Sequence, residues 1–197
     1  MENEVKEPAL KYPLISPEDY LAMERSATEK HEYFKGEVFA MSGASLEHNR
    51  IFHNIYGQLF THLKGKDCTP YGSDLRIHIP ANSLYTYPDI SIICGTPELT
   101  DEWSDTITNP AVIIEILSKS TADYDRGGKF TLYRSIQSLK EYILIDSTQT
   151  CIEIFTKQFN EHWLLSEYKK LTDIVEVKTI SFQLLLQEVY TDVFSEK

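Results

Sequence analysis

The chain has 197 residues, which is enough for one domain with a sizeable core, expected to span 1–197. Its formal net charge of −11 argues against a protein that binds nucleic acid over its whole surface, because binding DNA depends on neutralising phosphates. The start of the chain, residues 1–7, is acidic and polar, unlike a targeting peptide, and no apolar run is long enough to span a membrane, so we expect a cytoplasmic protein with no membrane segment.

A short helix, a hairpin and a longer helix are predicted first. Ser16-Pro17 followed by two acids is typical of a helix start, and this helix should end at about Ser26. The alternating residues of 31–41, with Lys35-Gly36 in the middle, predict a hairpin. The longer helix opens after Ser45, and one of its faces is apolar: Ile51, Ile55, Leu59 and Leu63.

Strands dominate the remainder of the chain. We expect strands near 75–79, 88–93 and 111–117, then a helix at about 128–138 and a strand at 142–146. Antiparallel strands at 151–155 and 163–167 follow, and a short closing helix begins at Phe182. This mixture predicts an α/β (mixed α+β) fold with a central mixed β-sheet flanked by helices.

The three cysteines, Cys68, Cys94 and Cys151, are odd in number and show no CxxC spacing. This usage suits a reducing cytoplasm and argues against a disulfide framework or a structural zinc site.

Two acids interrupt apolar strands. Glu115 lies within 111–117, a run that is typical of a strand buried on both faces, where an ionised carboxylate costs several kcal/mol unless a cation or strong donors meet it. Asp89 lies at the mouth of a second apolar strand. Carboxylates on neighbouring core strands suit a divalent metal site for phosphodiester cleavage, so we expect both to open into one cleft. The alternatives are a turn acid after Pro88 and a buried glutamate held by an arginine or tyrosine.

A series of motifs carries a family resemblance. They are Gly36-Glu37, Met41-Ser42-Gly43, Gly72-Ser73-Asp74-Leu75-Arg76, Tyr87-Pro88-Asp89, Glu115-Ile116-Leu117-Ser118, Ser120-Thr121, Asp125-Arg126, Lys129-Phe130, Tyr133 and Glu141-Tyr142. In this order the chain resembles the Uma-type restriction endonuclease family of the PD-(D/E)XK nuclease-like superfamily, over about 16–190. The resemblance implies a restriction-endonuclease-like core and Mg²⁺-dependent (or Mn²⁺-dependent) cleavage of DNA.

The resemblance also implies roles for individual residues. Asp89 and Glu115 would ligate the metal through hard carboxylate oxygens, which Mg²⁺ prefers, and the carbonyl of Ile116 would add a further oxygen. Glu37 would supply another acid from the predicted hairpin, as the early acidic residue of the superfamily does.

The superfamily's lysine is displaced. Its expected position is occupied by Leu117, a departure that the Uma-type family shares. Lys129 is the best replacement, with Asp125 and Tyr133 one helical turn away on the same face, and its charge would position water and stabilise the transition state. Lys119 is the second candidate, and a solvated helix lysine is the alternative interpretation of Lys129.

Supporting residues are predicted around this centre. His48 can line the mouth of the cleft, although a histidine at a helix end is the more ordinary interpretation. Arg76 can contact a phosphate or pair with a nearby acid. Five bases make 115–140 locally basic, as a DNA-facing segment or as a solvated helix would be: Lys119, Arg126, Lys129, Arg134 and Lys140.

Three classes of function remain open on the sequence. They are a metal-dependent endonuclease, a catalytically degenerate nucleic-acid-binding or regulatory protein, and a structural protein whose buried acids only hold the core together. We expect an endonuclease to be a homodimer, since cutting both strands of a duplex needs two sites. Four aromatic residues near the C-terminus offer surface for a dimer or pack in the core: Trp163, Tyr168, Phe182 and Tyr190.

Overall fold

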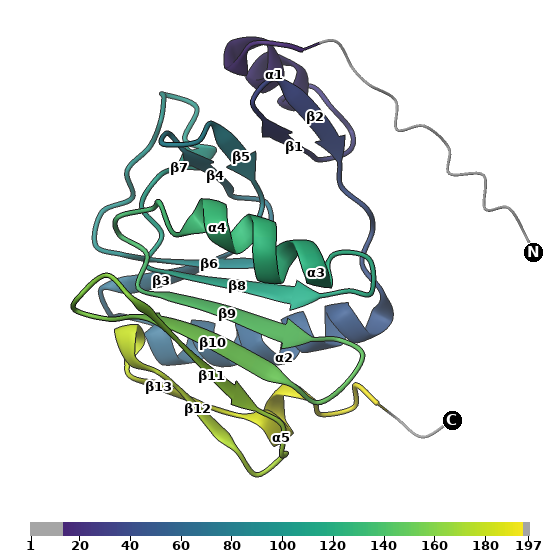
Figure 1. The fold of residues 1–197 in the computed structure, drawn as a ribbon, viewed down its shortest axis with the longest axis vertical. Coiled ribbons are helices and arrows are strands. Elements are labelled where there is room, and N and C mark those ends of the chain that lie inside the picture. Colours follow the sequence, from purple (N-terminus) through teal and green to yellow (C-terminus); the bar gives the residue numbers. More distant parts are fainter. Residues whose placement is uncertain (1–13, 195–197) are drawn as a thin grey trace, which may run out of the picture.

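A six-stranded mixed sheet forms the centre of the molecule (Figure 1). The computed structural model describes residues 14–194, so the acidic segment 1–7 lies outside the described residues. The order of the strands is β11-β10-β9-β8-β6-β3, and only β8 and β9 run parallel among these neighbours. Their bounds are β3 (Cys68–Gly72), β6 (Ile90–Cys94), β8 (Val112–Leu117), β9 (Glu141–Asp146), β10 (Ile152–Lys157) and β11 (Trp163–Tyr168). The predicted mixed sheet is confirmed.

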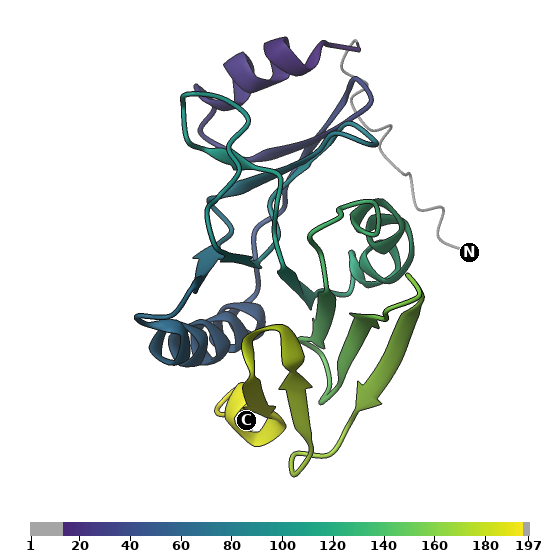
Figure 2. The same ribbon diagram turned by 90° about the vertical axis from the view of Figure 1, so that its left-hand side faces the viewer.

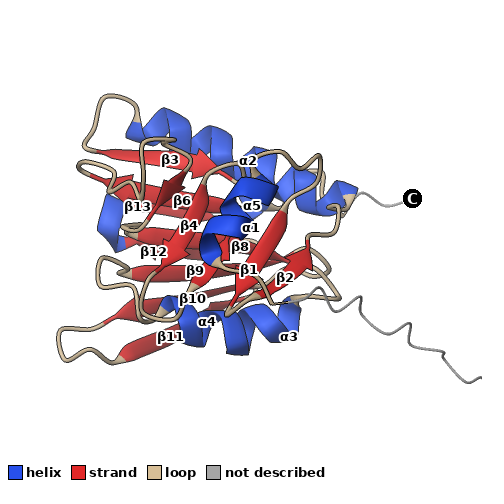
Figure 3. Cartoon of the chain, turned by 90° about the horizontal axis from the view of Figure 1, so that it is seen from above, coloured by secondary structure: helices blue, strands red, loops and turns tan. Residues whose placement is uncertain are grey.

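The long helix α2 (Leu46–Leu63) covers one face of this sheet (Figure 3). Its N-cap is Ser45, whose hydroxyl accepts the backbone N–H of His48, as expected for a serine that precedes an amphipathic segment. The buried residues of α2 are the four that the periodicity singled out: Ile51, Ile55, Leu59 and Leu63. They belong to one core with residues of β6, β8, β9 and the C-terminal hairpin.

The C-terminal segment completes that face differently from the prediction. Phe182–Leu185 forms strand β13, which pairs with β12 (Ile174–Val177), and the short helix α5 begins only at Leu186 and ends at Val189. In the apolar run from Phe182, buried and more exposed side chains alternate, which is the period of a strand and not of a helix. Ser181, with φ of 49°, turns the chain into β13.

A helical segment lies on the opposite face of the central sheet, away from α2 (Figure 2). It comprises α3 (Ala122–Tyr124), a π-helical turn η1 (Asp125–Lys129) and α4 (Phe130–Tyr133). The helix therefore begins earlier and ends earlier than the predicted 128–138. Aromatic rings hold it to the sheet, since Phe130 stacks on Tyr142 of β9 with ring centroids 5.2 Å apart.

A second sheet, built mainly from the N-terminal part of the chain, stands above the same face (Figures 1 and 2). Its strand order is β2-β1-β5-β4-β7. The bounds are β1 (His31–Phe34), β2 (Glu37–Ala40), β4 (Arg76–Ile79), β5 (Leu84–Thr86) and β7 (Thr106–Ile107). The predicted hairpin is β1–β2, and the predicted first helix is α1 (Pro17–Glu24), capped by Ser16. Side chains of β4 and β5 share a core with those of β8, β9 and α4, which docks this sheet onto the central one.

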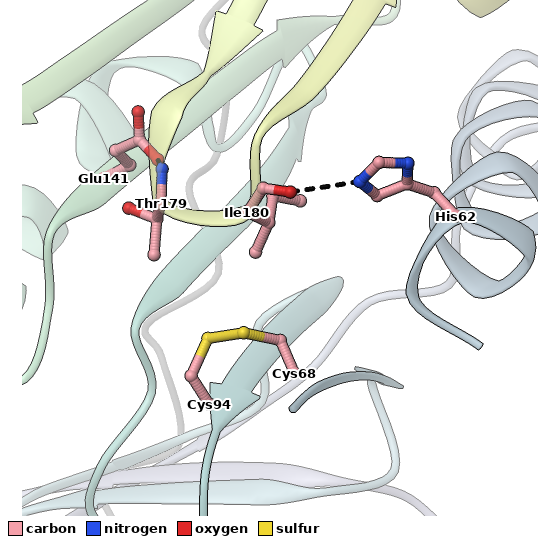
Figure 4. The surroundings of a disulfide bond; sticks show 6 residues. All are labelled: His62, Cys68, Cys94, Glu141, Thr179 and Ile180. Atoms are coloured by element: carbon pink, nitrogen blue, oxygen red, sulfur yellow. Dashed lines mark hydrogen bonds between the residues drawn. A yellow bond between two sulfur atoms is a disulfide. The ribbon is translucent and has the colours of Figure 1, made fainter. Parts of the chain in front are cut away.

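Two cysteines form a disulfide, so the prediction of no disulfide framework was wrong. Cys68 on β3 and Cys94 on β6 are direct partners in the antiparallel register, and their sulfur atoms are 2.04 Å apart (Figure 4). They are 26 residues apart in sequence, and the pairing arises only from the register of strand β3, which the sequence pattern did not reveal. Cys151 is a free, buried thiol.

The C-terminal aromatic residues mostly pack within the protomer. Trp163 lies edge-on to Phe130 at a centroid distance of 5.3 Å, and Phe182 belongs to the core on the α2 face. The hydroxyl of Tyr190 donates to the carbonyl of Cys151 over 2.7 Å. Core packing thus accounts for these side chains. Between residues 14 and 194, no helix has the length and apolarity that crossing a membrane requires.

Candidate active site

Glu115 faces the helical segment from the middle of β8. Alternate residues of a strand point to opposite faces, and Ile114 and Ile116 belong to the core on the α2 side. Ile113 and Leu117 belong to the core on the other side, so Glu115 lies between them on that face. Only 4% of the residue is exposed, so its carboxylate depends on protein donors or a cation.

Asp89 meets Glu115 from the neighbouring strand. It directly precedes β6, whose first residue, Ile90, is paired with Ile114 of β8. The backbone N–H of Asp89 donates to Glu115 Oε2 over 3.3 Å, and the backbone N–H of Ile116 donates to Asp89 Oδ2 over 2.7 Å. These reciprocal hydrogen bonds confirm the predicted adjacency of the two strands and bring both carboxylates into one cluster.

Lys129 reaches this pair from the helical segment. Its Nζ lies 2.9 Å from Glu115 Oε1, and the side chain is 8% exposed. Two further carboxylates surround the ammonium group, with Glu32 Oε1 at 3.2 Å and Asp125 Oδ1 at 3.8 Å. The interpretation of Lys129 as a solvated helix lysine is therefore wrong.

The π-helical turn places both Asp125 and Lys129 against Glu115. Its widened backbone is held from the sheet, because the hydroxyl of Tyr142 donates to the Asp125 carbonyl over 3.1 Å. Arg126 points the other way and donates from Nε to Glu153 Oε2 over 2.6 Å. A Cβ at Gly128 would lie 3.0 Å from the ring of Tyr124, so a larger residue there would require this exposed side chain to shift. Such π turns interrupt helices frequently at functional sites.

Tyr133 supplies the last donor to Glu115. Its hydroxyl donates to Glu115 Oε1 over 2.8 Å, and the residue is fully buried. Burial raises the pKa of Glu115 well above its ordinary range; Lys129 opposes this effect, whereas Asp125 and Asp89 add to it. Burial alone would lower the pKa of Lys129, but the surrounding carboxylates, with Glu115 first, raise it well above its ordinary value. Lys129 is therefore a cation with more acidic neighbours than it can neutralise.

His48 approaches the cluster from the first turn of α2. Its Nε2 lies 3.2 Å from Asp89 Oδ2, and the side chain is 14% exposed. Its Nδ1 is buried and has no hydrogen-bond partner within residues 14–194. The sequence led us to expect His48 at the mouth of the cleft, and the structure puts it beside Asp89.

Three other candidates lie elsewhere. Glu37 is exposed at the start of β2, and Lys119 is exposed in the turn after β8. Arg76 is buried in the N-terminal sheet, where it donates to the Tyr87 hydroxyl over 2.7 Å and lies 3.0 Å from Asp105. For Arg76, the alternative of pairing with a nearby acid describes the structure.

Sequence reasoning missed Glu32. This residue lies in the predicted hairpin, but an acid in a polar alternating stretch gives no sign that it will contact a lysine far along the chain. The alternation of β1 was the available signal, because Tyr33 turns to the core beneath α1 and Glu32 must then face the opposite way.

The cluster has the chemistry that a Mg²⁺ or Mn²⁺ ion requires. Asp89 and Glu115 offer hard oxygen ligands, and acids exceed bases around them. The carbonyl of Ile116 points to the same strand edge as its N–H, toward Asp89, because both groups of one strand residue share an edge. In residues 14–194 no three His, Cys, Asp or Glu side chains form a ready metal cage. Mg²⁺ suits such a site, since one or two carboxylates with waters and substrate phosphates usually hold it.

The chain matches one family profile over most of its length. Residues 17–187 match the profile of Uma2, described as "Putative restriction endonuclease". An "Uncharacterized protein slr1290" of Synechocystis sp. is 38% identical over 93% of this chain and 95% of its own length. A second Synechocystis protein, "Uncharacterized protein sll1609", is 37% identical over 78% of this chain and 87% of its own. The crystal structure of "a putative nuclease belonging to DUF820" from Anabaena variabilis shares the fold, with a TM-score of 0.76 at 15% identity, over 91% of this chain and 99% of that one.

Proposed function

Because the chain belongs to the Uma2 family of the restriction endonuclease type, we propose that it is a divalent-metal-dependent endonuclease that hydrolyses phosphodiester bonds of DNA. The observation that carries this proposal is the convergence of Asp89, Glu115 and Lys129. Two carboxylates from neighbouring strands and one buried ammonium group occupy a single cluster, although they come from three separate segments.

Asp89 and Glu115 would hold Mg²⁺ or Mn²⁺, with the carbonyl of Ile116 as a further oxygen ligand. When bound, the metal supplies Lewis-acid chemistry: it lowers the pKa of water and offsets charge on the attacked phosphate. Lys129 would orient the attacking water and stabilise charge that develops on the phosphate. Lys129 and Tyr133 both contact Glu115 Oε1, and they therefore hold this carboxylate in place.

His48 and Tyr133 are proposed to support the two carboxylates. His48 limits the rotation of Asp89 through its contact with Oδ2, and Tyr133 limits that of Glu115. Carboxylates fixed in this way lose less freedom on binding an ion, which is how neighbouring residues tune a metal site.

We also propose a cytoplasmic homodimer that cuts one DNA strand per site. The charge of −11 requires that contact with DNA be confined to a local basic surface. Lys119 and Arg134, which are exposed within the locally basic segment 115–140, are suited to such contact. Light scattering at high concentration that gives only the mass of one chain would count against the dimer.

The test is nicking of supercoiled plasmid DNA by purified protein with Mn²⁺ or Mg²⁺. Wild-type protein should convert the plasmid to the open-circular form, and chelation of the metal should stop the reaction. Asp89→Asn and Glu115→Gln should abolish nicking, since each removes an anionic ligand and keeps the size of the side chain. Asp123→Asn, an exposed acid of α3, is the matched control and should remain active.

One result would reject the endonuclease. If wild-type protein with Mn²⁺ nicks no more than a variant that lacks both carboxylates, cleavage is not its function. Retained binding of DNA in a gel-shift assay would then favour the alternative, a catalytically degenerate nucleic-acid-binding or regulatory protein on the same fold.

A further inference from the structure

We propose that Glu32, on the N-terminal sheet, is a positioning residue that holds the ammonium group of Lys129 for the reaction. This inference rests on the proposed function. Glu32 comes from β1, and Lys129 from the helical segment on the central sheet, so their 3.2 Å contact joins the two sheets across the cluster.

The carboxylate of Glu32 is itself fixed. The register of β1 and β5, with Tyr33 opposite Tyr85, places Glu32 opposite Thr86. The hydroxyl of Thr86 donates to Glu32 Oε1, the same oxygen that contacts Lys129. Thr86 is fully buried and Glu32 has a side chain only 16% exposed, so the pair is a preformed part of the site.

Glu32 matters because the other partners of Lys129 are less suited to hold it during the reaction. Glu115 is the closest, at 2.9 Å, but in the proposed function this carboxylate is a metal ligand and its oxygens are shared. Asp125 is more distant, at 3.8 Å. Glu32 is the nearer of the two carboxylates that remain, so it keeps the ammonium group in place when Glu115 turns to the ion.

The position of Glu32 also explains why the N-terminal sheet belongs to the site. The sheet docks on the central core through apolar residues of β4 and β5, which fix its height above the cluster. Glu32 then extends downward from β1 to the ammonium group. Glu37, the first residue of β2 and the partner of Phe34 in the hairpin register, is exposed, and within residues 14–194 it makes no ion pair with Lys129.

The first test measures the ammonium group directly and does not depend on cleavage. Protein labelled with ¹⁵N should give a protected lysine ammonium NMR signal, assigned to Lys129 by its loss in Lys129→Arg. Glu32→Gln should shift or broaden this signal, and Glu32→Asp should restore part of it. Glu29→Gln, an exposed acid just before β1, is the control that should leave it unchanged.

The second test separates positioning from metal binding and from folding. With Mn²⁺, Glu32→Gln should lower kcat for plasmid nicking by at least tenfold with KM unchanged, and Glu32→Asp should recover part of the loss. Calorimetry should give a Mn²⁺ affinity within threefold of wild type, and the thermal transition should stay cooperative.

Three results would overturn the role of Glu32. The first is an ammonium signal and a kcat that are both unchanged in Glu32→Gln. The second is a tenfold loss of Mn²⁺ affinity in Glu32→Gln, which would make Glu32 a metal ligand. The third is a loss of turnover in Glu37→Gln and not in Glu32→Gln. If wild-type protein does not nick DNA but the ammonium signal still depends on Glu32, the proposed function fails and the Glu32–Lys129 pair is purely structural.

Discussion

Lys129 Nζ lies 2.9 Å from Glu115 Oε1, so an ammonium group from the helical segment reaches a carboxylate in the middle of β8. Leu117, two residues beyond Glu115 on the strand, faces the apolar core on the same side of the sheet. The cation beside Glu115 therefore comes from another element and not from the strand that carries the carboxylate. In the proposed function this ammonium group serves in place of the lysine that the resemblance leads us to expect at position 117.

Replacing Lys129 by alanine should destabilise the folded protein, and bound metal should offset part of this loss of stability. Without metal, the variant leaves buried Glu115 without its cation, and breaking a buried pair typically costs about 3–5 kcal/mol of stability. Mn²⁺ replaces the missing charge and should therefore raise the Tm of Lys129→Ala more than that of wild type. Turnover should fall about a hundredfold even at saturating metal, because a transition-state contact of this kind contributes on the order of 3 kcal/mol.

Calorimetry, thermal denaturation and plasmid nicking check this prediction together. Lys170→Ala is the control, since this lysine is exposed in the turn after β11 and lies outside the basic segment 115–140. Equal stabilisation of wild type and Lys129→Ala by Mn²⁺ would show that the ion does not bind at Glu115.

Arg126 should be important for the placement of the π-helical turn. Its guanidinium group lies 2.6 Å from Glu153 on β10 and 3.6 Å from Asp146 on β9, both of which are largely buried. Arg126→Ala leaves these carboxylates without their cation and should cost about 1–3 kcal/mol in urea denaturation. Nicking should also weaken, because Lys129 lies on the same turn.

Arg134→Ala is the matched control for Arg126→Ala. Arg134 is exposed and contacts Thr131 within its own helix. An equal loss of stability in Arg134→Ala and Arg126→Ala would mean that positive charge in general, and not the ion pairs of Arg126 with β9 and β10, stabilises the protein.

Acid should weaken the N-terminal sheet through Asp105. The hydrogen bond from Arg25 is the largest cause that lowers the pKa of Asp105 below its ordinary value of 3.8, with Thr106 and Arg76 adding to it and burial opposing it. A carboxyl group whose pKa is lowered by folding stabilises the folded state fully above its unfolded pKa. This stabilisation is lost as the pH falls through the folded pKa.

Urea denaturation of wild type and Asp105→Asn across pH checks this sign. Wild type should be the more stable protein at neutral pH, and the difference should shrink as the pH falls below about 4. A difference that stays constant between pH 7 and pH 3 would contradict the ion pair as its source.

The Cys68–Cys94 bond should stabilise the outer edge of the central sheet. It joins β3, the last strand of that edge, to β6, and closes a loop with a sequence separation of 26. Cross-links of this size typically contribute about 2–4 kcal/mol. Reduction should therefore lower the Tm of wild-type protein, and Cys68→Ser should lower it without further response to reductant. An equal Tm in oxidised and reduced protein would contradict this contribution.

Elements with strong periodicity could be predicted from the sequence. Ser45 and the four apolar residues of α2 marked that helix correctly, and the buried strand around Glu115 was equally clear. The short strands β5, β7 and β12 were missed because two to four residues give too little pattern to separate a strand from a loop. The run from Phe182 was assigned to a helix because its apolar density hid an alternation of period two.

The residues of the candidate site also divide into those that the sequence pattern reveals and those that it does not. Asp89 and Glu115 could be found because an acid in an apolar strand conflicts with its surroundings, and that conflict is visible locally. Glu32 and the disulfide could not, since each depends on how two distant strands are placed. The alternation of β1 indicates which way Glu32 faces, but not which residue it meets on the other sheet.

The π-helical turn determines which changes in length the chain can accept. A π turn carries about five residues through roughly the rotation that four residues make in an α-helix, so it takes up one extra residue while the segments on either side keep their phase. The loss of one residue from the Gly127-Gly128 pair would return the segment to α-helical winding and leave Tyr133 facing Glu115, whereas the gain of one residue would rotate everything after it by about 100°. The chain should therefore tolerate the loss of one residue at this turn better than the gain of one.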